Sequence, residues 1–250
     1  MSFAPRASSL AVLAVAALAP SCRIHVGDGV WFDGKRYPVS RTVEFHPSDA
    51  DLERFSLESV DGDVTIHGDA DENRIVATLH ERAHGVGELV FDRGVLRVVG
   101  RGDAVIGEVE LWLACPLGEI SVHTDVGDLR VDGLEVRSSV DLSSSVGDVE
   151  VDGLHAPDRI DVDSGTGDVR IANATTAKLS VAMGIGDVEL SDLDCDEASV
   201  ATGTGDVSVA RSRIGSLTVS TEIGDVDVDV DTCEIGYSSY DVGLGSLHVD

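Results

Sequence analysis

Six aspartates recur at nearly constant spacing in the second half of the chain, and a stacked column of carboxylates could bind a divalent cation. Adjacent carboxylates about 4.8 Å apart, the distance between neighbouring strands, repel by roughly 0.9 kcal/mol per pair even in water. Ca²⁺ would relieve that repulsion, because carboxylate and carbonyl oxygens are its usual ligands. The column is Asp128, Asp148, Asp168, Asp187, Asp206 and Asp225, at intervals of 20, 20, 19, 19 and 19 residues.

The competing interpretation of this column is structural, and the sequence favours it. Each of the six aspartates follows a glycine. Glycine accepts the positive φ that a tight corner requires, and Asp accepts hydrogen bonds from nearby backbone N–H groups. Known calcium-binding solenoids repeat G-G-x-G-x-D every nine residues, a different period from the one found here. Calcium is therefore the one cofactor that the pattern suggests. The simpler interpretation is that each Gly-Asp pair forms a turn.

The elements that would position this column are short strands in a long internal repeat. Apolar residues stand two and four positions after each marker glycine, as Val149 and Val151 do after Gly147, and they alternate again before it. Alternation of this kind places one apolar face on each strand. Two short strands cannot bury such a face alone, whereas stacked copies can. We therefore predict an all-β fold, a parallel β-solenoid of about nine rungs with a 19–20-residue repeat.

Two further columns follow from the same register. Charges alternate three residues after the glycine, and in a stack of rungs they would become vertical neighbours of opposite sign. These residues are Glu110, Arg130, Glu150, Arg170 and Glu189. A mostly aliphatic column directly before the glycine is expected to face inward with the other apolar positions. Its members are Val126, Val146, Thr166, Ile185, Thr204 and Ile223.

The N-terminus predicts export. Residues 1–21 read as a signal peptide of the lipoprotein type, with an apolar stretch "LAVLAVAALA" that is too short to span a membrane. Cys22 would then be the lipidated residue, and cleavage after "ALA" at 17–19 is the alternative. Residues 22–50 lack the repeat and are interpreted as a tether and N-terminal cap, with the solenoid domain over 51–250. The predicted location is the bacterial cell envelope, in the periplasm or on the outer membrane.

Composition limits the partners. The chain carries 46 Asp and Glu against 18 Lys and Arg, for a formal charge of −28. Nucleic acid and anionic membrane surfaces bind proteins through a basic face, so neither is expected as a partner. The protein would be held at a membrane only by its lipid anchor. The last rung breaks off at Asp250. An uncapped rung favours end-to-end pairing with a second copy.

The cysteines and paired carboxylates have less specific patterns. Cys195 and Cys233 each stand nine residues after a marker glycine, two rungs apart at about 9–10 Å, too far for a disulfide. We predict free thiols in the core.

Pairs such as Asp132 with Asp152, or Asp141 with Asp161, would suit a glycan-cleaving β-helix enzyme. In a chain this acidic such pairs arise without function, so no catalytic residues are assigned.

Several stretches resemble the bacterial family of β-strand-repeat proteins called putative adhesins. They are "FSLESVDGDVTIHG" (55–68), "VELWLACPLGEISVHTDVGDLRVDGL" (109–134) and the recurring glycine-centred rungs. The resemblance covers roughly residues 50–250 and implies an exported β-solenoid in adhesion or envelope scaffolding, without catalytic residues.

The functional hypothesis is therefore a non-enzymatic exported interaction module, whose partner is an envelope protein, a surface protein or a glycan. The alternatives are a polysaccharide-active β-helix enzyme and an envelope-stress accessory protein.

Overall fold

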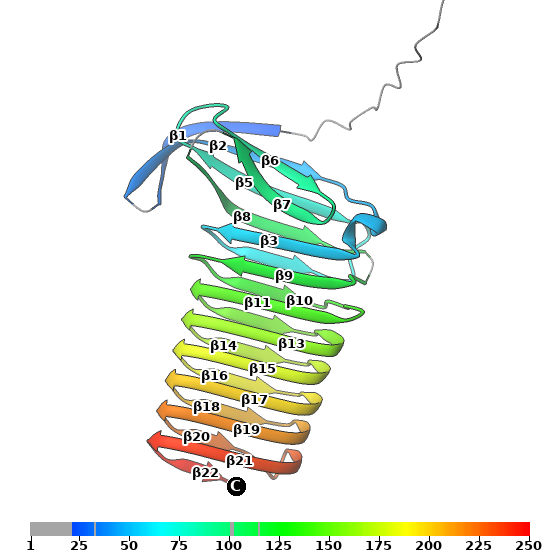
Figure 1. Ribbon diagram of the computed structural model, residues 1–250, viewed down its shortest axis with the longest axis vertical. Helices are drawn as coiled ribbons and strands as arrows, with labels where there is room; N and C mark the ends of the chain where they lie inside the picture. Colours follow the sequence, from blue (N-terminus) through cyan, green and yellow to red (C-terminus); the bar gives the residue numbers. More distant parts are fainter. Residues whose placement is uncertain (1–21, 33, 101–102, 115) are drawn as a thin grey trace, which may run out of the picture.

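The computed structural model describes residues 22–250 except 33, 101–102 and 115, and its longest axis follows a stack of strands (Figure 1). The predicted signal peptide, residues 1–21, lies outside the described residues. Cys22 is the first residue of β1, and its side chain is also outside the description. Within the described ranges, no helix is long and apolar enough to cross a membrane.

The larger part of the molecule is a parallel β-solenoid, as predicted. Each turn contributes a longer and a shorter strand. The longer strands are β9 (Glu119–Thr124), β11 (Ser139–Val146), β13 (His155–Thr166), β15 (Thr175–Ile185), β17 (Asp194–Thr204), β19 (Arg213–Ile223) and β21 (Glu234–Leu244). The shorter strands are β10 (Leu129–Asp132), β12 (Val149–Asp152), β14 (Val169–Ala172), β16 (Val188–Ser191), β18 (Val207–Ala210), β20 (Val226–Val228) and β22 (Leu247–Val249).

The stacking is in register along both faces. Val149 of β12 lies between Leu129 and Val169, and Ile160 of β13 lies between Val140 and Leu179. From β9 to β22 the chain makes about 6 complete turns, so the seven strand pairs fall short of the about nine rungs predicted. The count is lower because the strands before β9 do not all follow the repeat.

An antiparallel unit covers the N-terminal end of the solenoid (Figure 1). Its strands are β1 (Cys22–Phe32), β2 (Lys35–Phe45), β5 (Arg74–Glu81), β6 (Gly87–Asp92), β7 (Val95–Gly100) and β8 (Ala104–Trp112). The order β1–β2–β5–β8 is antiparallel throughout, and β6 and β7 form a hairpin beside it. A short 3-10 helix, Asp49–Leu52, leads from β2 into the solenoid.

The first rung is out of chain order, and here the sequence prediction is wrong. Strands β3 (Arg54–Val60) and β4 (Val64–His67) form a rung that stacks directly on β9 and β10. On its other side β4 pairs with β8, and β3 pairs with β7 and with one residue of β8. Glu110 therefore lies opposite Thr65 and not beside Arg130. The sequence signals this insertion by the interval between two repeat glycines, 25 residues from Gly62 to Gly87 against 19–21 later in the chain.

The predicted core columns are confirmed for both strand types. The shorter strands alternate buried and outward positions, as Val169 and Ile171 show on either side of the exposed Arg170. One predicted column is wrong, because the residue before the corner glycine is exposed: Ile185 has 58% of its surface accessible. The chain bends at this corner, so alternation ends one residue earlier than the pattern suggests.

We expect Ile171→Ala to lower the free energy of unfolding by about 2–5 kcal/mol, because the fully buried side chain would leave a cavity between stacked rungs. The matched change Ile185→Ala should alter it by less than about 0.5 kcal/mol. Urea unfolding followed by circular dichroism measures both. Equal losses in the two variants would contradict the assignment of faces.

Candidate binding surfaces

The aspartate column forms a ladder of hydrogen bonds along one corner of the solenoid. Each Oδ1 accepts the backbone N–H of the equivalent residue in the next rung, as Asp168 does from Asp187 at 3.0 Å. Asp63 occupies the column in the inserted rung and accepts from Asp128 at 3.0 Å. At the other end Asp225 accepts from both the backbone and the hydroxyl of Ser246, which lowers the pKa of this carboxyl. The remaining steps join Asp128 to Asp148, Asp148 to Asp168, Asp187 to Asp206 and Asp206 to Asp225.

Two features of the corner require the glycine before each aspartate: its backbone conformation and its close contact with the next rung. Gly147 has φ 145°, outside the range that side-chain-bearing residues adopt with ease. A Cβ on Gly147 would also lie 2.0 Å from the carbonyl oxygen of Gly127 in the rung below. The corners therefore stack too closely for any other residue, and the predicted turn role of Gly-Asp agrees with this geometry.

This geometry gives every ladder aspartate a structural task that needs no cation. In the described part of the chain, no group of three or more His, Cys, Asp or Glu side chains is arranged to hold a metal ion. The calcium site at Asp128, Asp148, Asp168, Asp187, Asp206 and Asp225 stays a prediction. A rise in melting temperature with Ca²⁺ beyond that with Mg²⁺ at equal ionic strength would support it.

We expect Asp168→Ala to be more destabilising than Asp168→Asn, by about 0.5–1.5 kcal/mol. Both changes remove a charge and its repulsion, but only the amide keeps an oxygen that accepts the Asp187 N–H. Thermal unfolding of the two variants at pH 7 makes the comparison. Indistinguishable variants would show that the hydrogen bond contributes nothing.

The charged column on the shorter strands pairs in twos. Arg130 Nη1 lies 2.7 Å from Glu150 Oε2, and Arg170 Nε lies 2.7 Å from Glu189 Oε2. Vertical pairing of opposite charges is therefore confirmed between β10 and β12 and between β14 and β16. Glu110 takes no part in it, because the inserted rung separates Glu110 from Arg130.

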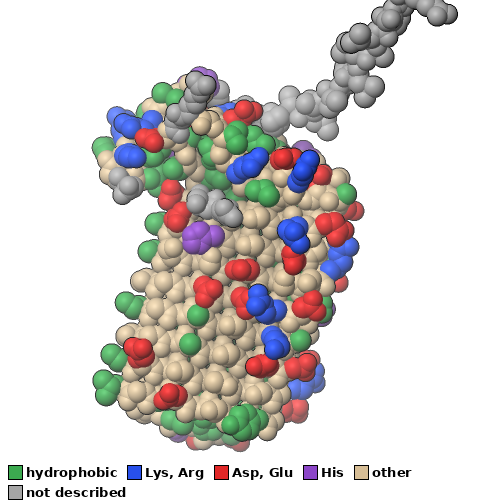
Figure 2. All heavy atoms as spheres, viewed as in Figure 1, with side chains coloured by type: hydrophobic (Ala, Val, Ile, Leu, Met, Phe, Trp, Pro, Cys, Tyr) green, Lys and Arg blue, Asp and Glu red, His purple; other side chains and the backbone are tan. Residues whose placement is uncertain are grey.

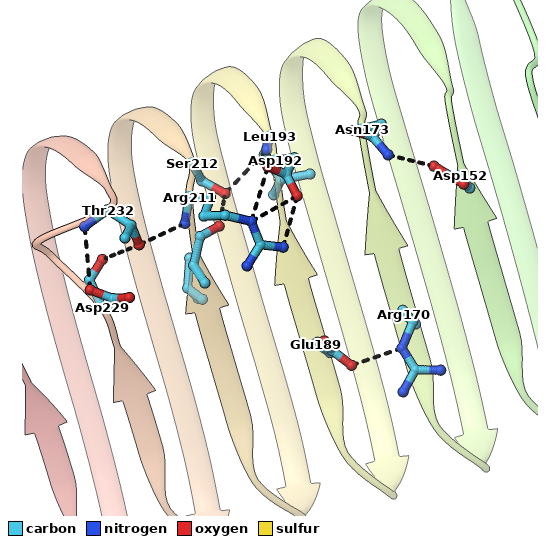
Figure 3. A network of polar contacts seen from close by, with 12 residues as sticks. Asp152, Arg170, Asn173, Glu189, Asp192, Leu193, Arg211, Ser212, Asp229 and Thr232 are labelled. Carbon is cyan, nitrogen blue, oxygen red and sulfur yellow. Dashed lines mark hydrogen bonds and ion pairs between the residues drawn. The ribbon is translucent and has the colours of Figure 1, made fainter.

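A second corner, after the shorter strands, is held by a polar network (Figure 3). Asn173 donates to Asp152 at 2.7 Å, and Arg211 donates to both carboxylate oxygens of Asp192 at 2.8–3.1 Å. These hydrogen bonds lower the pKa of Asp192. The corner column adopts left-handed backbone conformations, with φ from 49° to 71°. Its members are Gly133, Gly153, Asn173, Asp192 and Arg211.

This second corner was not predicted from the sequence. The repeated Asp-Gly pairs at 132–133 and 152–153 were its available signal, because Gly and Asn tolerate left-handed conformations. Arg211 does not tolerate them well, and its bidentate pairing with Asp192 offsets part of the cost.

We expect Arg130→Glu to lower stability by about 0.2–1 kcal/mol, because the pair with Glu150 is partly exposed. Adding Glu150→Arg should recover most of the loss. Melting curves at low and high salt test the charge dependence. A double variant no more stable than the single variant would argue against pairing between the rungs.

An exposed apolar ridge runs along the first corner, parallel to the stack. We define the apolar ridge as Val126, Val146, Thr166, Ile185, Thr204, Ile223 and Leu244, of which consecutive members from Val146 onward are strand partners. Its five aliphatic side chains are 49–71% exposed. Figure 2 shows hydrophobic side chains protruding one above another along the left edge of the solenoid.

A shallow groove of about 680 Å³ lies directly beside the apolar ridge. Its floor consists mainly of small residues, including Gly165, Gly184 and Gly203, each immediately before a ridge residue in the chain. The missing side chains leave the outer face hollow at this point. The groove also contains His123, Asp163 and Glu222, and no Lys or Arg is among its described lining residues.

One arrangement in this groove resembles a nucleophilic triad. Ser143 Oγ lies 2.7 Å from His123 Nδ1, and His123 Nε2 lies 3.4 Å from Asp125. Side chains of Asp125 and His123 are 46% and 40% exposed, so water screens the pair. The groove's described lining offers no cationic group for a developing oxyanion. We interpret these contacts as surface hydrogen bonds.

The carboxylate pairs considered for an enzyme do lie in register, Asp132 beside Asp152 and Asp141 beside Asp161. Burial raises the pKa of Asp161, and Arg159, 2.5 Å away, opposes the shift. Asp132 and Asp152 are exposed, and Asp152 already accepts from Asn173. Neither pair lines the groove.

Cys195 and Cys233 are free thiols, as predicted, but only Cys195 is buried in the core, and Cys233 is half-buried. Burial raises the pKa of Cys195 to about 11, so this thiol is an unreactive core residue. Cys233 is not in the column of Cys195, because Ile235 stacks there through Ile214. The turn before β21 contains additional residues, which place Cys233 against the backbone N–H of Ser212 instead.

The fold has counterparts among solved structures. A protein from Bacteroides fragilis described as a putative adhesin superposes with a TM-score of 0.59 at 15% identity, over 84% of this chain and 97% of that one. A putative adhesin from Parabacteroides distasonis gives 0.52 at 16% identity, over 90% and 98%. At such identities the likeness shows the fold alone. No curated protein matches the chain in sequence.

A family model provides independent support. It is described as Toastrack DUF4097 and matches residues 155–244, which extend from β13 through β21. The model and the two structures confirm that this chain resembles the putative adhesins, an all-β solenoid family without an assigned function.

Proposed function

We propose that the protein is an exported, non-enzymatic interaction module of the bacterial cell envelope, held at a membrane by a lipid on Cys22. The proposal of an interaction module rests on the protein's surface, which has regular ladders of side chains, an open, shallow groove and an apolar ridge. An elongated stack offers a long face to a partner. The fold of the two putative adhesins supports the same conclusion.

The polysaccharide-active enzyme is the less supported alternative. Cleavage of a glycosidic bond needs a carboxylic acid and a carboxylate facing the same bound sugar. The paired aspartates lie outside the groove, and the two carboxylates among its described lining, Asp163 and Glu222, are accompanied mainly by Ser, Gly and Ala. The groove's shallow, open form also lacks the concavity that usually encloses a substrate.

Lipidation is tested on the full chain expressed in a bacterium that processes lipoproteins. We expect the protein to incorporate labelled palmitate and to sediment with membranes, and the Cys22→Ala variant to do neither. Retention of the variant in the membrane fraction, without label, would contradict the lipid anchor.

Interaction is tested by co-sedimentation of the purified protein with isolated cell envelopes. We expect saturable binding, removed by protease treatment of the envelopes if the partner is a protein and by glycan-degrading enzymes if it is a glycan. Reducing-sugar release should stay at background. Release that rises with protein concentration would identify an enzyme instead.

A further inference from the structure

The apolar ridge is the least expected feature of this acidic surface. Five aliphatic side chains stand in one line, and Leu244 exposes 71% of its surface. Single exposed apolar residues are ordinary, but five of them in one line, interrupted only by Thr166 and Thr204, mark an interaction site. With rungs about 4.8 Å apart, the seven positions extend over about 29 Å.

Carboxylates border the apolar ridge on both sides. The aspartate ladder follows it around the corner, two residues further along each rung, as Asp187 follows Ile185. On the groove side lie Asp163 and Glu222, and no Lys or Arg is among the described lining. Each ladder carboxylate uses Oδ1 for the stack, so its second oxygen has no role in the ladder.

This combination excludes some occupants. A second copy would bring like ladders together on chains of net charge −28, which is unfavourable. A neutral glycan would leave the carboxylates unmatched. It would also find no aromatic face to stack on, since neither the ridge nor the described groove lining contains Phe, Tyr or Trp.

We propose that the apolar ridge and its groove bind a basic amphipathic helix of a partner protein, lying parallel to the solenoid axis. The pitch of an α-helix is about 5.4 Å, close to the rung spacing of about 4.8 Å, so successive helical turns meet successive ridge residues. A partner strand would fit less well, because side chains on one face of a strand recur about every 6.8 Å, further from the rung spacing than the helical pitch is. Leucine-like side chains of the partner helix would pack on the ridge, and Lys or Arg side chains on either side of them would pair with the carboxylates.

This inference rests on the proposed interaction function and specifies its partner. The probe is an 18-residue amphipathic peptide of Leu and Lys, titrated into the purified protein by calorimetry. The controls are a Leu/Glu peptide with the same pattern and a scrambled Leu/Lys peptide of the same composition. We expect the amphipathic Leu/Lys peptide to bind at least tenfold more tightly than either control, and added salt to weaken it.

Variants of the protein locate the site. The double change Ile185→Ser and Ile223→Ser should weaken binding at least tenfold. Val99→Ser, at an exposed apolar position of the N-terminal unit, should leave the affinity within twofold. The double change Asp148→Asn and Asp187→Asn keeps the ladder oxygens and should weaken binding severalfold, while Asp196→Asn on an exposed position of β17 should not. Melting curves confirm that each variant is folded.

Two results would overturn the proposal. One is equal affinity for the amphipathic and scrambled peptides, which would indicate only unspecific charge attraction. The other is unchanged binding by the Ile185→Ser and Ile223→Ser variant. Envelope binding that persists without any peptide binding would leave the proposed function intact and reject the helix as its partner.

Discussion

The close stacking of backbones at the glycine corners is the constraint on which the rest of the structure depends. Successive rungs approach so nearly that a Cβ on Gly186 would lie 2.0 Å from the carbonyl oxygen of Gly167. A corner this tight leaves a backbone N–H pointing along the stack without a carbonyl partner. The aspartate that follows each glycine accepts that N–H with its side chain, and so the same two residues recur from Gly62-Asp63 to Gly224-Asp225, with Gly245-Ser246 in the last turn.

The corner also determines which residues can vary. Most inward positions are filled by Val, Leu and Ile, because each rung must cover the apolar face of its neighbours. Outward positions have the equivalent residues above and below as neighbours. Arg130 with Glu150 and Arg170 with Glu189 use that contact for ion pairs of modest value. Elsewhere the outer faces are free to serve a partner.

The apolar ridge is a direct result of the bend. The residue before each corner glycine would be inward if the strand continued, and its side chain has the apolar character of a core position. Because the chain turns one residue earlier, Ile185 and Ile223 emerge beside the aspartate ladder. The bend therefore exposes a largely apolar line between carboxylates, and it is the surface to which we assign the partner.

The sequence by itself determined the repeat, the two strands per turn, their parallel register and the Gly-Asp corner, because period and alternation are local properties of a chain. It also predicted free thiols at Cys195 and Cys233, although it placed both in one column and Cys233 lies outside it. Only the tertiary structure decided that β3 and β4 stack between β8 and β10, which separates Glu110 from Arg130. It alone decided that Ile185 is exposed, that Cys233 leaves the column of Cys195 and that Arg211 takes a left-handed conformation. These outcomes depend on where the chain bends and which distant rung it meets, and alternation along one strand carries no information about either.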